Sequence, residues 1–153
     1  MSRIILALAL FAAAGCVSYA DEPMTVEAVS AAAKDGVTLV GNDYIQARQT
    51  QNPAVLLVDV RTEEEFNLAH IPGAKWIPRG RSEFEFAKTV RDAEAEIILY
   101  CKTGSRASLV KKALDAQGYR NVTVHQGFET WAEAGLPVEN ALGLLTLIET
   151  PAD

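Results

Sequence analysis

The chain has 153 residues, of which 49% are hydrophobic and 22% are charged, and its formal net charge is −6. This length and apolar content suit one compact domain with a buried core, and they argue against intrinsic disorder. The acidic balance argues against general affinity for nucleic acid or anionic membranes, so recognition of an anion must come from local charge.

The first twenty residues differ from the rest of the chain. A single cation, Arg3, precedes an uninterrupted apolar run over residues 4–14, and the stretch ends in small residues. This order is typical of a secretory signal peptide, and the apolar run is too short to span a membrane. We therefore expect cleavage after Ala20 and export of the protein, to the periplasm in a Gram-negative bacterium.

A second interpretation of the same stretch involves Cys16. The letters AAGC at residues 13–16 resemble a bacterial lipobox, in which the cysteine carries lipid and becomes the new N-terminus. Ala13 stands where that motif usually has leucine, so simple cleavage is favoured over a lipid anchor. The only other cysteine is Cys101, which in either case is left without a disulfide partner in its own chain.

Helical patterns and short apolar runs alternate along the remaining sequence. Helices are predicted over residues 25–36, 42–52, 62–70, 82–93, 106–118 and 127–135. Strands are predicted over residues 37–40, 54–60, 96–100 and 121–125 and, after a turn, within 71–78. This alternation predicts an α/β fold with a mostly parallel sheet covered on both faces, and such sheets bind ligands beyond the carboxyl ends of their strands.

Two helix starts carry capping signals. Asn42 is expected to cap the helix over residues 42–52. Thr62 and Glu65 have the spacing of a capping box at the start of the helix over residues 62–70.

The chain is predicted to have four segments. They are a signal peptide (1–20), an N-terminal extension (21–38), one domain (39–139) and a C-terminal tail (140–153). The tail contains the apolar run ALGLLTLIET. Packing of this run on the core is favoured, and a surface for a partner is the alternative.

The stretch CKTGSR, residues 101–106, leads from a predicted strand into a predicted helix. The thiolate is the reactive form of a cysteine, and nearby cations or a helix N-terminus favour it. Gly104 permits the positive φ with which the loop can curl its N–H groups around the sulfur as an anion nest. The other loop residues supply a positive charge or a hydroxyl group: Lys102, Thr103, Ser105 and Arg106. These neighbours favour a nucleophilic Cys101 over a buried cysteine that only fills space.

The spacing from Cys101 to Arg106 is Cys-x4-Arg. Cysteine-dependent phosphatases have five intervening residues, and their longer loop surrounds a phosphate group. A loop shorter by one residue forms a tighter ring of amides, which suits a smaller target such as a sulfur atom bonded to the cysteine.

Four motifs occur in the chain in a characteristic order: LLVDVRTEEEF, HIPGAKWIP, IILYCKTGSRAS and GFETWAEAGLPV. In these motifs the chain resembles a single-domain rhodanese, a sulfurtransferase, over residues 39–139. The resemblance implies a central five-stranded parallel sheet. It also implies that Cys101 accepts sulfur from a sulfane-sulfur donor such as thiosulfate, holds it as a persulfide and passes it to cyanide or a thiol, with no metal or organic cofactor.

The same resemblance assigns the site residues. Residues 102–106 correspond to the active-site loop, whose amides stabilise the thiolate and the persulfide. Lys102 and Arg106 are expected to attract a small anionic donor. Asp59 and Arg61 are expected to form a structural ion pair or hydrogen-bond network near the site. The expected partners are therefore the donor and the thiol or cyanide acceptor, without nucleic acid or a membrane span.

Several nearby residues are given a structural role. Gln126 stands where the family often has a glycine, so the turn at this position is expected to differ. His125 and His70 are expected to be structural, and Arg79 is a lesser candidate for the mouth of the site. The two tryptophans, Trp76 and Trp131, are expected in the core.

Two other functions remain as alternatives. One is a cysteine phosphatase or arsenate reductase of the same fold, against which the short loop argues. The other is a non-enzymatic module that carries sulfur for, or binds to, a periplasmic partner. A thioredoxin-like function is disfavoured because the sequence has no C-x-x-C pair.

Overall fold

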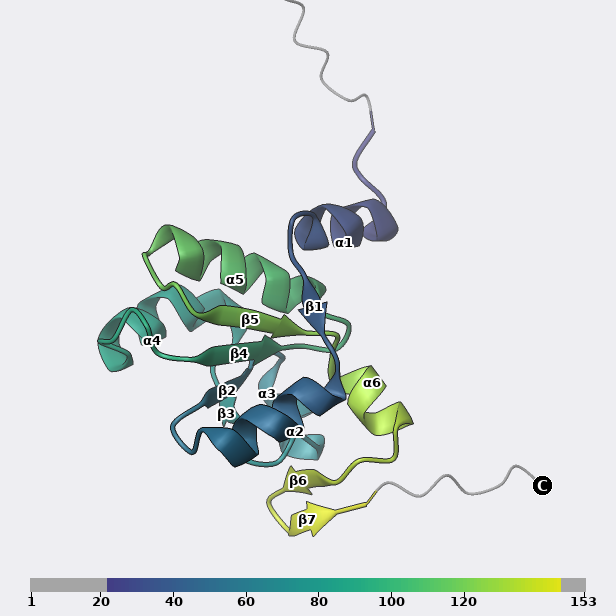
Figure 1. Cartoon of the computed structure of the whole chain (residues 1–153). Coiled ribbons are helices and arrows are strands. Elements are labelled where there is room, and N and C mark those ends of the chain that lie inside the picture. Colours follow the sequence, from purple (N-terminus) through teal and green to yellow (C-terminus); the bar gives the residue numbers. More distant parts are fainter. Residues whose placement is uncertain (1–21, 147–153) are drawn as a thin grey trace, which may run out of the picture.

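Five parallel strands form the centre of the protein in the computed structural model, which describes residues 22–146 (Figure 1). The strands are β1 (Leu39–Val40), β2 (Leu56–Asp59), β3 (Lys75–Trp76), β4 (Ile97–Tyr100) and β5 (Val122–His125). Their order across the sheet is β1-β5-β4-β2-β3, and every neighbouring pair is parallel. The predicted α/β class and five-stranded sheet are confirmed, whereas the predicted signal peptide, residues 1–20, lies outside the described residues.

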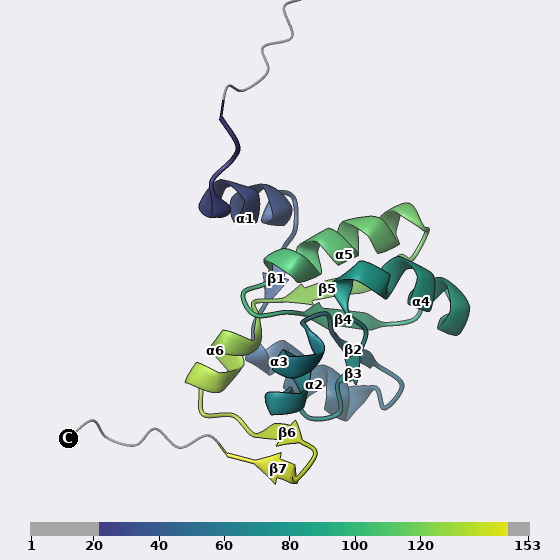
Figure 2. The same ribbon diagram turned by 180° about the vertical axis from the view of Figure 1, so that it is seen from behind.

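Helices cover both faces of this sheet (Figures 1 and 2). They are α1 (Val26–Lys34), α2 (Asn42–Gln51), α3 (Glu63–Leu68), α4 (Ser82–Thr89), α5 (Ser105–Ala116) and α6 (Phe128–Glu133), with a 3₁₀ turn η1 (Arg79–Arg81) before α4. One buried cluster joins the sheet to Phe86 of α4 and Val110 of α5, and a second joins it to Ile45 of α2 and Trp131 of α6. No helix within residues 22–146 combines the length and the apolar character that crossing a membrane requires.

The central strand β4 contributes alternate side chains to the two layers. Ile97 and Leu99 belong to the cluster under α4 and α5, whereas Ile98 and Tyr100 belong to the cluster under α2 and α6. All four side chains are fully buried, which explains the uninterrupted apolar run in the sequence. Cys101 continues this alternation, since it lies in the same cluster as Leu99.

The two predicted helix caps differ in outcome. Thr62 and Glu65 form the predicted capping box at the start of α3, where the Glu65 N–H donates to the Thr62 hydroxyl and the Thr62 N–H donates to the Glu65 carboxylate. The prediction of an Asn42 cap is wrong, because Asn42 is already the first residue of α2. Its amide instead donates to the backbone oxygen of Thr130 and bonds the ring of His125.

A hairpin leads from the end of the domain into the C-terminal tail. Strands β6 (Val138–Asn140) and β7 (Gly143–Leu145) pair antiparallel, separately from the main sheet. The side chains of Leu142 and Leu144 are 89% and 67% exposed. Packing of the tail on the core is therefore wrong for the described part of the tail, because the short hairpin turns these leucines toward solvent. Residues 147–153 lie outside the described residues.

A buried ion pair joins Asp59 and Arg61 at the carboxyl end of β2, as the sequence predicts. Arg61 donates from Nε and Nη2 to the Asp59 carboxylate at 2.6 to 3.0 Å, and from Nη2 to the backbone oxygen of Ala69 at 2.7 Å. The guanidinium also lies 4.2 Å from the ring centroid of Phe128 in α6. One buried cation thus connects β2, the segment after α3 and the start of α6.

Replacement of Asp59 tests the contribution of this pair. Asp59→Asn should lower the free energy of unfolding by about 3–5 kcal/mol, because it leaves the Arg61 charge buried without its partner. Arg120→Gln removes an ion pair with Glu94 in which both side chains are mostly exposed, and should cost about 1 kcal/mol or less. Urea unfolding of both variants beside the wild type measures the difference. Equal losses in the free energy of unfolding for Asp59→Asn and Arg120→Gln would contradict the prediction.

Candidate functional site

Cys101 is the first residue after β4, at the carboxyl end of a strand that has neighbours on both sides. Ligand sites of parallel sheets lie at this edge. The side chain is 1% exposed and belongs to the same cluster as Val60 and Ala107. It is the only cysteine among residues 22–146. Burial fits both a space-filling cysteine and a shielded nucleophile, so the surrounding backbone decides between the two hypotheses.

The backbone oxygens of the cysteine and its neighbour bond to α6. The N–H of Phe128 donates to the carbonyl of Cys101 at 2.7 Å, and the N–H of Glu129 donates to the carbonyl of Lys102 at 3.2 Å. These N–H groups belong to the first turn of α6, where they have no acceptor in their own helix. The loop and the helix therefore satisfy each other, and the loop carbonyls are held against α6.

Gly127 makes this contact sterically possible. A Cβ at this position would stand 2.2 Å from the carbonyl oxygen of Lys102 and 2.7 Å from the nitrogen of Thr103, and the residue has a φ of +128°. No residue with a side chain fits there without a shift of the loop backbone. The sequence prediction for this turn concerns Gln126, which is exposed, and does not include the role of Gly127. The glycine that opens the GFETW motif was the available signal.

Gly104 turns the loop into α5. Its φ is +84°, and it is the N-cap of this twelve-residue helix, which starts at Ser105 and so one residue before the predicted start. Among the described residues, no backbone N–H group of residues 102–106 donates a hydrogen bond to a protein acceptor. The loop therefore combines unpartnered amides with a helix N-terminus, an arrangement that stabilises an anion.

Both predicted cations of the loop lie in ion pairs. Arg106 donates from Nη1 and Nη2 to the two carboxylate oxygens of Glu65 at 2.7 and 2.8 Å. Lys102 Nζ lies 3.1 Å from a carboxylate oxygen of Glu129. The expectation that these cations attract an anion must therefore allow for a carboxylate beside each of them.

The pKa values reflect the tighter pair. Hydrogen bonding by Arg106 lowers the pKa of Glu65 to about 2. The pKa of Arg106 is raised, chiefly by its hydrogen bond to Glu65 and to a smaller degree by the sulfur of Cys101. The Glu65 carboxylate is therefore the principal partner of the guanidinium.

Glu65 is a residue of the site that sequence reasoning treated only as part of a capping box. It reaches back to the N-terminus of its own helix and across to Arg106 in α5. The helix α3 follows β2 directly, and the carboxyl end of β2 is at the same edge of the sheet as Cys101. This topological position of a first-turn carboxylate was the available signal.

The two hydroxyl groups of the loop have different surroundings. The side chain of Thr103 is exposed. The Oγ atom of Ser105 lies 2.6 Å from the Oγ atom of Ser30, in α1 of the N-terminal extension. The predicted loop therefore contacts a segment that sequence reasoning did not connect with it.

His125 is a buried, neutral residue that supports the turn at Gly127. The N–H of Gly127 donates to Nδ1 at 3.1 Å, and Nε2 lies 2.8 Å from Oδ1 of Asn42. Because Nδ1 accepts a hydrogen bond, the proton is on Nε2, which donates to Asn42. Burial lowers the pKa of His125 to about 4. Both ring nitrogens are occupied, which agrees with the structural role predicted for this residue.

The other residues singled out in the sequence belong to the framework. The ring of His70 stacks on Phe66 with centroids 3.8 Å apart, and Nδ1 lies 2.9 Å from the backbone oxygen of Phe66. Trp131 is buried, whereas Trp76 is only half-buried and donates from its indole N–H to the backbone oxygen of Arg61. Arg79 is exposed and lines an open hollow on η1 and α4.

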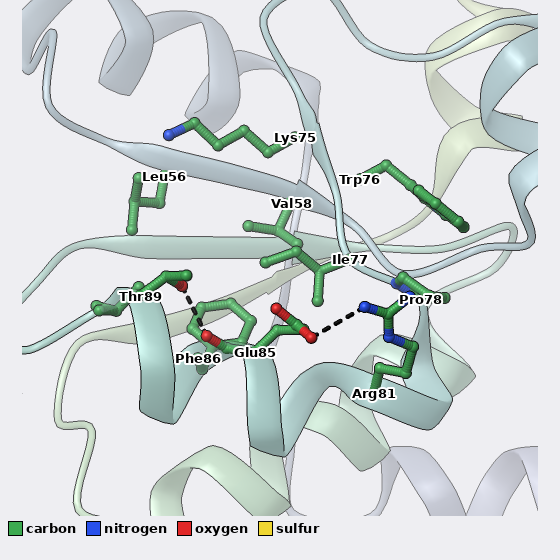
Figure 3. Close-up of a pocket in the computed structure, with 11 residues that line it drawn as sticks. Leu56, Val58, Lys75, Trp76, Ile77, Pro78, Arg81, Glu85, Phe86 and Thr89 are labelled. Carbon is green, nitrogen blue, oxygen red and sulfur yellow. Dashed lines mark hydrogen bonds and ion pairs between the residues drawn. The ribbon is translucent and has the colours of Figure 1, made fainter.

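A cavity of about 450 Å³ lies between β2, β3 and α4 (Figure 3). Its apolar lining includes Leu56, Val58, Ile77 and Phe86. The carboxylate of Glu85 and the guanidinium of Arg81 face each other at one side and form an ion pair of 3.0 Å. None of residues 101–106 lines this cavity, so it is separate from the Cys101 site.

The chain is similar to known sulfurtransferases in sequence and in fold. A profile of the Rhodanese-like domain matches residues 42–134. Thiosulfate sulfurtransferase GlpE of Actinobacillus succinogenes is 38% identical over 97 residues, which are 63% of this chain and 84% of that protein. Thiosulfate:glutathione sulfurtransferase of Saccharomyces cerevisiae is 31% identical over 96 residues, with coverage of 55% and 69%. The polysulfide-sulfur transferase homodimer of Wolinella succinogenes has a TM-score of 0.63 at 29% identity, with coverage of 74% and 86%.

Gly127→Ala should be strongly destabilising, because its methyl group overlaps the backbone of Lys102 and the residue needs a positive φ. We expect a loss of about 2–4 kcal/mol in the free energy of unfolding. Gly135→Ala is the matched control, since Gly135 also has a positive φ, +63°, but no atom within 4 Å of the added Cβ. Backbone strain alone should cost about 1–2 kcal/mol there. Urea unfolding compares the two, and a control as costly as Gly127→Ala would refute the steric argument.

The buried His125 predicts a pH dependence of stability. Its pKa is about 4 in the folded protein and 6.5 in the unfolded chain, so only the unfolded state binds the proton between these values. The contribution of neutral His125 to the free energy of unfolding is fully present above pH 6.5. The free energy of unfolding should fall by about 3 kcal/mol as the pH drops to 4. Urea unfolding between pH 7 and 5 isolates this slope from carboxylate titration. The slope should disappear in His125→Gln and persist in His70→Gln, whereas persistence in both variants would assign it to other groups.

Proposed function

The chain belongs to the rhodanese family, and on this premise we propose that it is a sulfurtransferase that works through a persulfide on Cys101. Sulfane sulfur passes from a donor such as thiosulfate to Cys101 and then to a thiol or cyanide. The relatives described above, which include sulfurtransferases named for thiosulfate, support this choice of donor.

One observation carries the proposal. Cys101 follows the central strand β4. The carbonyls of Cys101 and Lys102 bond to α6, and the amides of residues 102–106 have no acceptor among the described residues. Five N–H groups, two of which belong to the first turn of α5, are thereby available to a negative charge on sulfur. A cysteine that only fills space does not require a neighbouring loop whose N–H groups lack acceptors.

The proposed reaction needs only sulfur nucleophiles. The Cys101 thiolate attacks the outer sulfur of thiosulfate, a new S–S bond forms, the old one breaks, and sulfite leaves with the electron pair. The acceptor thiolate or cyanide then attacks the outer sulfur of the persulfide, and Cys101 leaves as a thiolate. The electrons balance over the two steps, so no external oxidant or reductant is consumed.

The surroundings of the sulfur favour a small transferred group. Cys101 is almost completely covered, and the loop is one residue shorter than that of a cysteine-dependent phosphatase. A single sulfur atom enters such a loop with less displacement than a phosphate group. Because Lys102 and Arg106 each have a carboxylate partner, the amides supply most of the anion stabilisation in this proposal.

A sulfur carrier without turnover of its own is the second candidate. The nearly complete burial of Cys101 favours it, because a covered sulfur is reached slowly by a free donor or acceptor. In this case a protein partner opens the loop and exchanges the sulfur. Slow multiple turnover together with stable persulfide formation distinguishes the carrier from the enzyme.

We further propose that the protein is exported. The support is the composition of residues 1–20, with a cation, an apolar run and a small-residue end. Cleavage after Ala20 starts the mature chain at Asp21, whereas lipidation starts it at Cys16.

Intact mass spectrometry after incubation with thiosulfate tests the persulfide. The wild type should gain one sulfur, about 32 Da, that dithiothreitol removes, and Cys101→Ser should gain nothing. Absence of the gain, with the thiol still open to alkylation, would exclude thiosulfate as the donor. The same spectrum of protein purified from the native host shows whether the chain starts at Asp21 or at a lipidated Cys16.

A further inference from the structure

The helix α1 lies beside the N-terminal end of α5 in both views of the molecule (Figures 1 and 2). It precedes the segment that matches the family model, residues 42–134. The side chain of Ala33 is buried, and Lys112 of α5 donates from Nζ to the backbone oxygen of Ala32 at 3.1 Å. The extension is therefore anchored along α5.

This extension also contacts the cysteine loop itself. The hydroxyls of Ser30 and Ser105 are 2.6 Å apart and join positions 75 residues apart in sequence. The side chain of Leu39, in the strand β1 that follows α1, lies against Gly104, since it is 3.1 Å from the position that a Cβ would take on that glycine. Ser105 is thus held by α1, and the adjacent Gly104 packs against the strand that follows α1.

We propose that Ser30 is a positioning residue for sulfur transfer, and that α1 is a built-in support of the Cys101 loop. This inference rests on the proposed function of that loop. The backbone N–H of Ser105 is one of the amides left for the anion, and Ser105 follows a glycine in the left-handed region. A side chain tied to α1 restricts the rotation of both peptide groups of Ser105.

The hydrogen bond between Ser30 and Ser105 acts by reducing the number of conformations that the loop can adopt. A glycine leaves its neighbours free to rotate, so an unsupported loop loses more entropy when its amides gather around an anion. A loop held in place before the reaction avoids much of that loss. The expected effect of Ser30 is therefore on reaction at Cys101 rather than on global stability.

A double-mutant cycle tests the hydrogen bond between Ser30 and Ser105. Ser30→Ala and Ser105→Ala should each lower kcat/KM for thiosulfate about threefold to tenfold, mainly through kcat, because one hydrogen bond is lost. The double variant should be no worse than either single variant. The conservative Ser30→Thr should restore most of the activity. Val26→Ala is the matched control, since Val26 lies on α1 and is 80% exposed.

The rate of Cys101 alkylation by iodoacetamide at pH 7 is the second readout. It should change in Ser30→Ala and in Ser105→Ala by a similar factor, and stay at the wild-type value in Val26→Ala. The proposal would be overturned if the Ser30→Ala variant kept both the alkylation rate and the kcat/KM of the wild type. Strictly additive effects of the two serine substitutions would also overturn it. Because alkylation needs no turnover, it decides whether α1 supports the Cys101 loop even if the wild type takes up no sulfur, a separate result that would refute the proposed function.

Discussion

The backbone of Gly127 lies directly against the backbone of Lys102 and Thr103, and the site depends on this close contact. A side chain at Gly127 would overlap the loop, so α6 approaches only because hydrogen is all that this residue carries there. The approach lets the first N–H groups of α6 bond to the carbonyls of Cys101 and Lys102. Nδ1 of His125 accepts a hydrogen bond from the N–H of Gly127 and so supports the turn. The amides that remain in the loop have no backbone acceptor and are available for the proposed anion nest.

Charge around the cysteine is balanced rather than simply positive. Arg106 pairs with the Glu65 carboxylate, and Lys102 pairs with Glu129. Glu65 connects α3 to α5 while it also completes its own capping box. Such pairing suits a site that alternates between a thiolate and a persulfide, since both states carry one negative charge and neither demands a large excess of cations.

Sequence reasoning succeeded where local patterns decide the outcome. The apolar runs predicted the strands, and Thr62 with Glu65 predicted the capping box, because its partners are three residues apart. It failed where distant groups compete for a side chain. Asn42 has a typical capping position, yet its amide bonds to His125 and Thr130, more than eighty residues away. The tail likewise looked like core material, but the β6–β7 hairpin leaves Leu142 and Leu144 exposed.

The sequence by itself determined the order of strands and helices, the position of Cys101 at the end of a buried strand and the likeness of its loop to that of rhodaneses. The first two features depend on periodicity and spacing within short segments, and the third depends on the resemblance of four motifs to those of a known family. Tertiary structure alone decided the carboxylate partners of the loop cations, the close approach at Gly127 and the link from Ser30 to Ser105. Each of these joins segments that only folding brings together, so no local pattern encodes it.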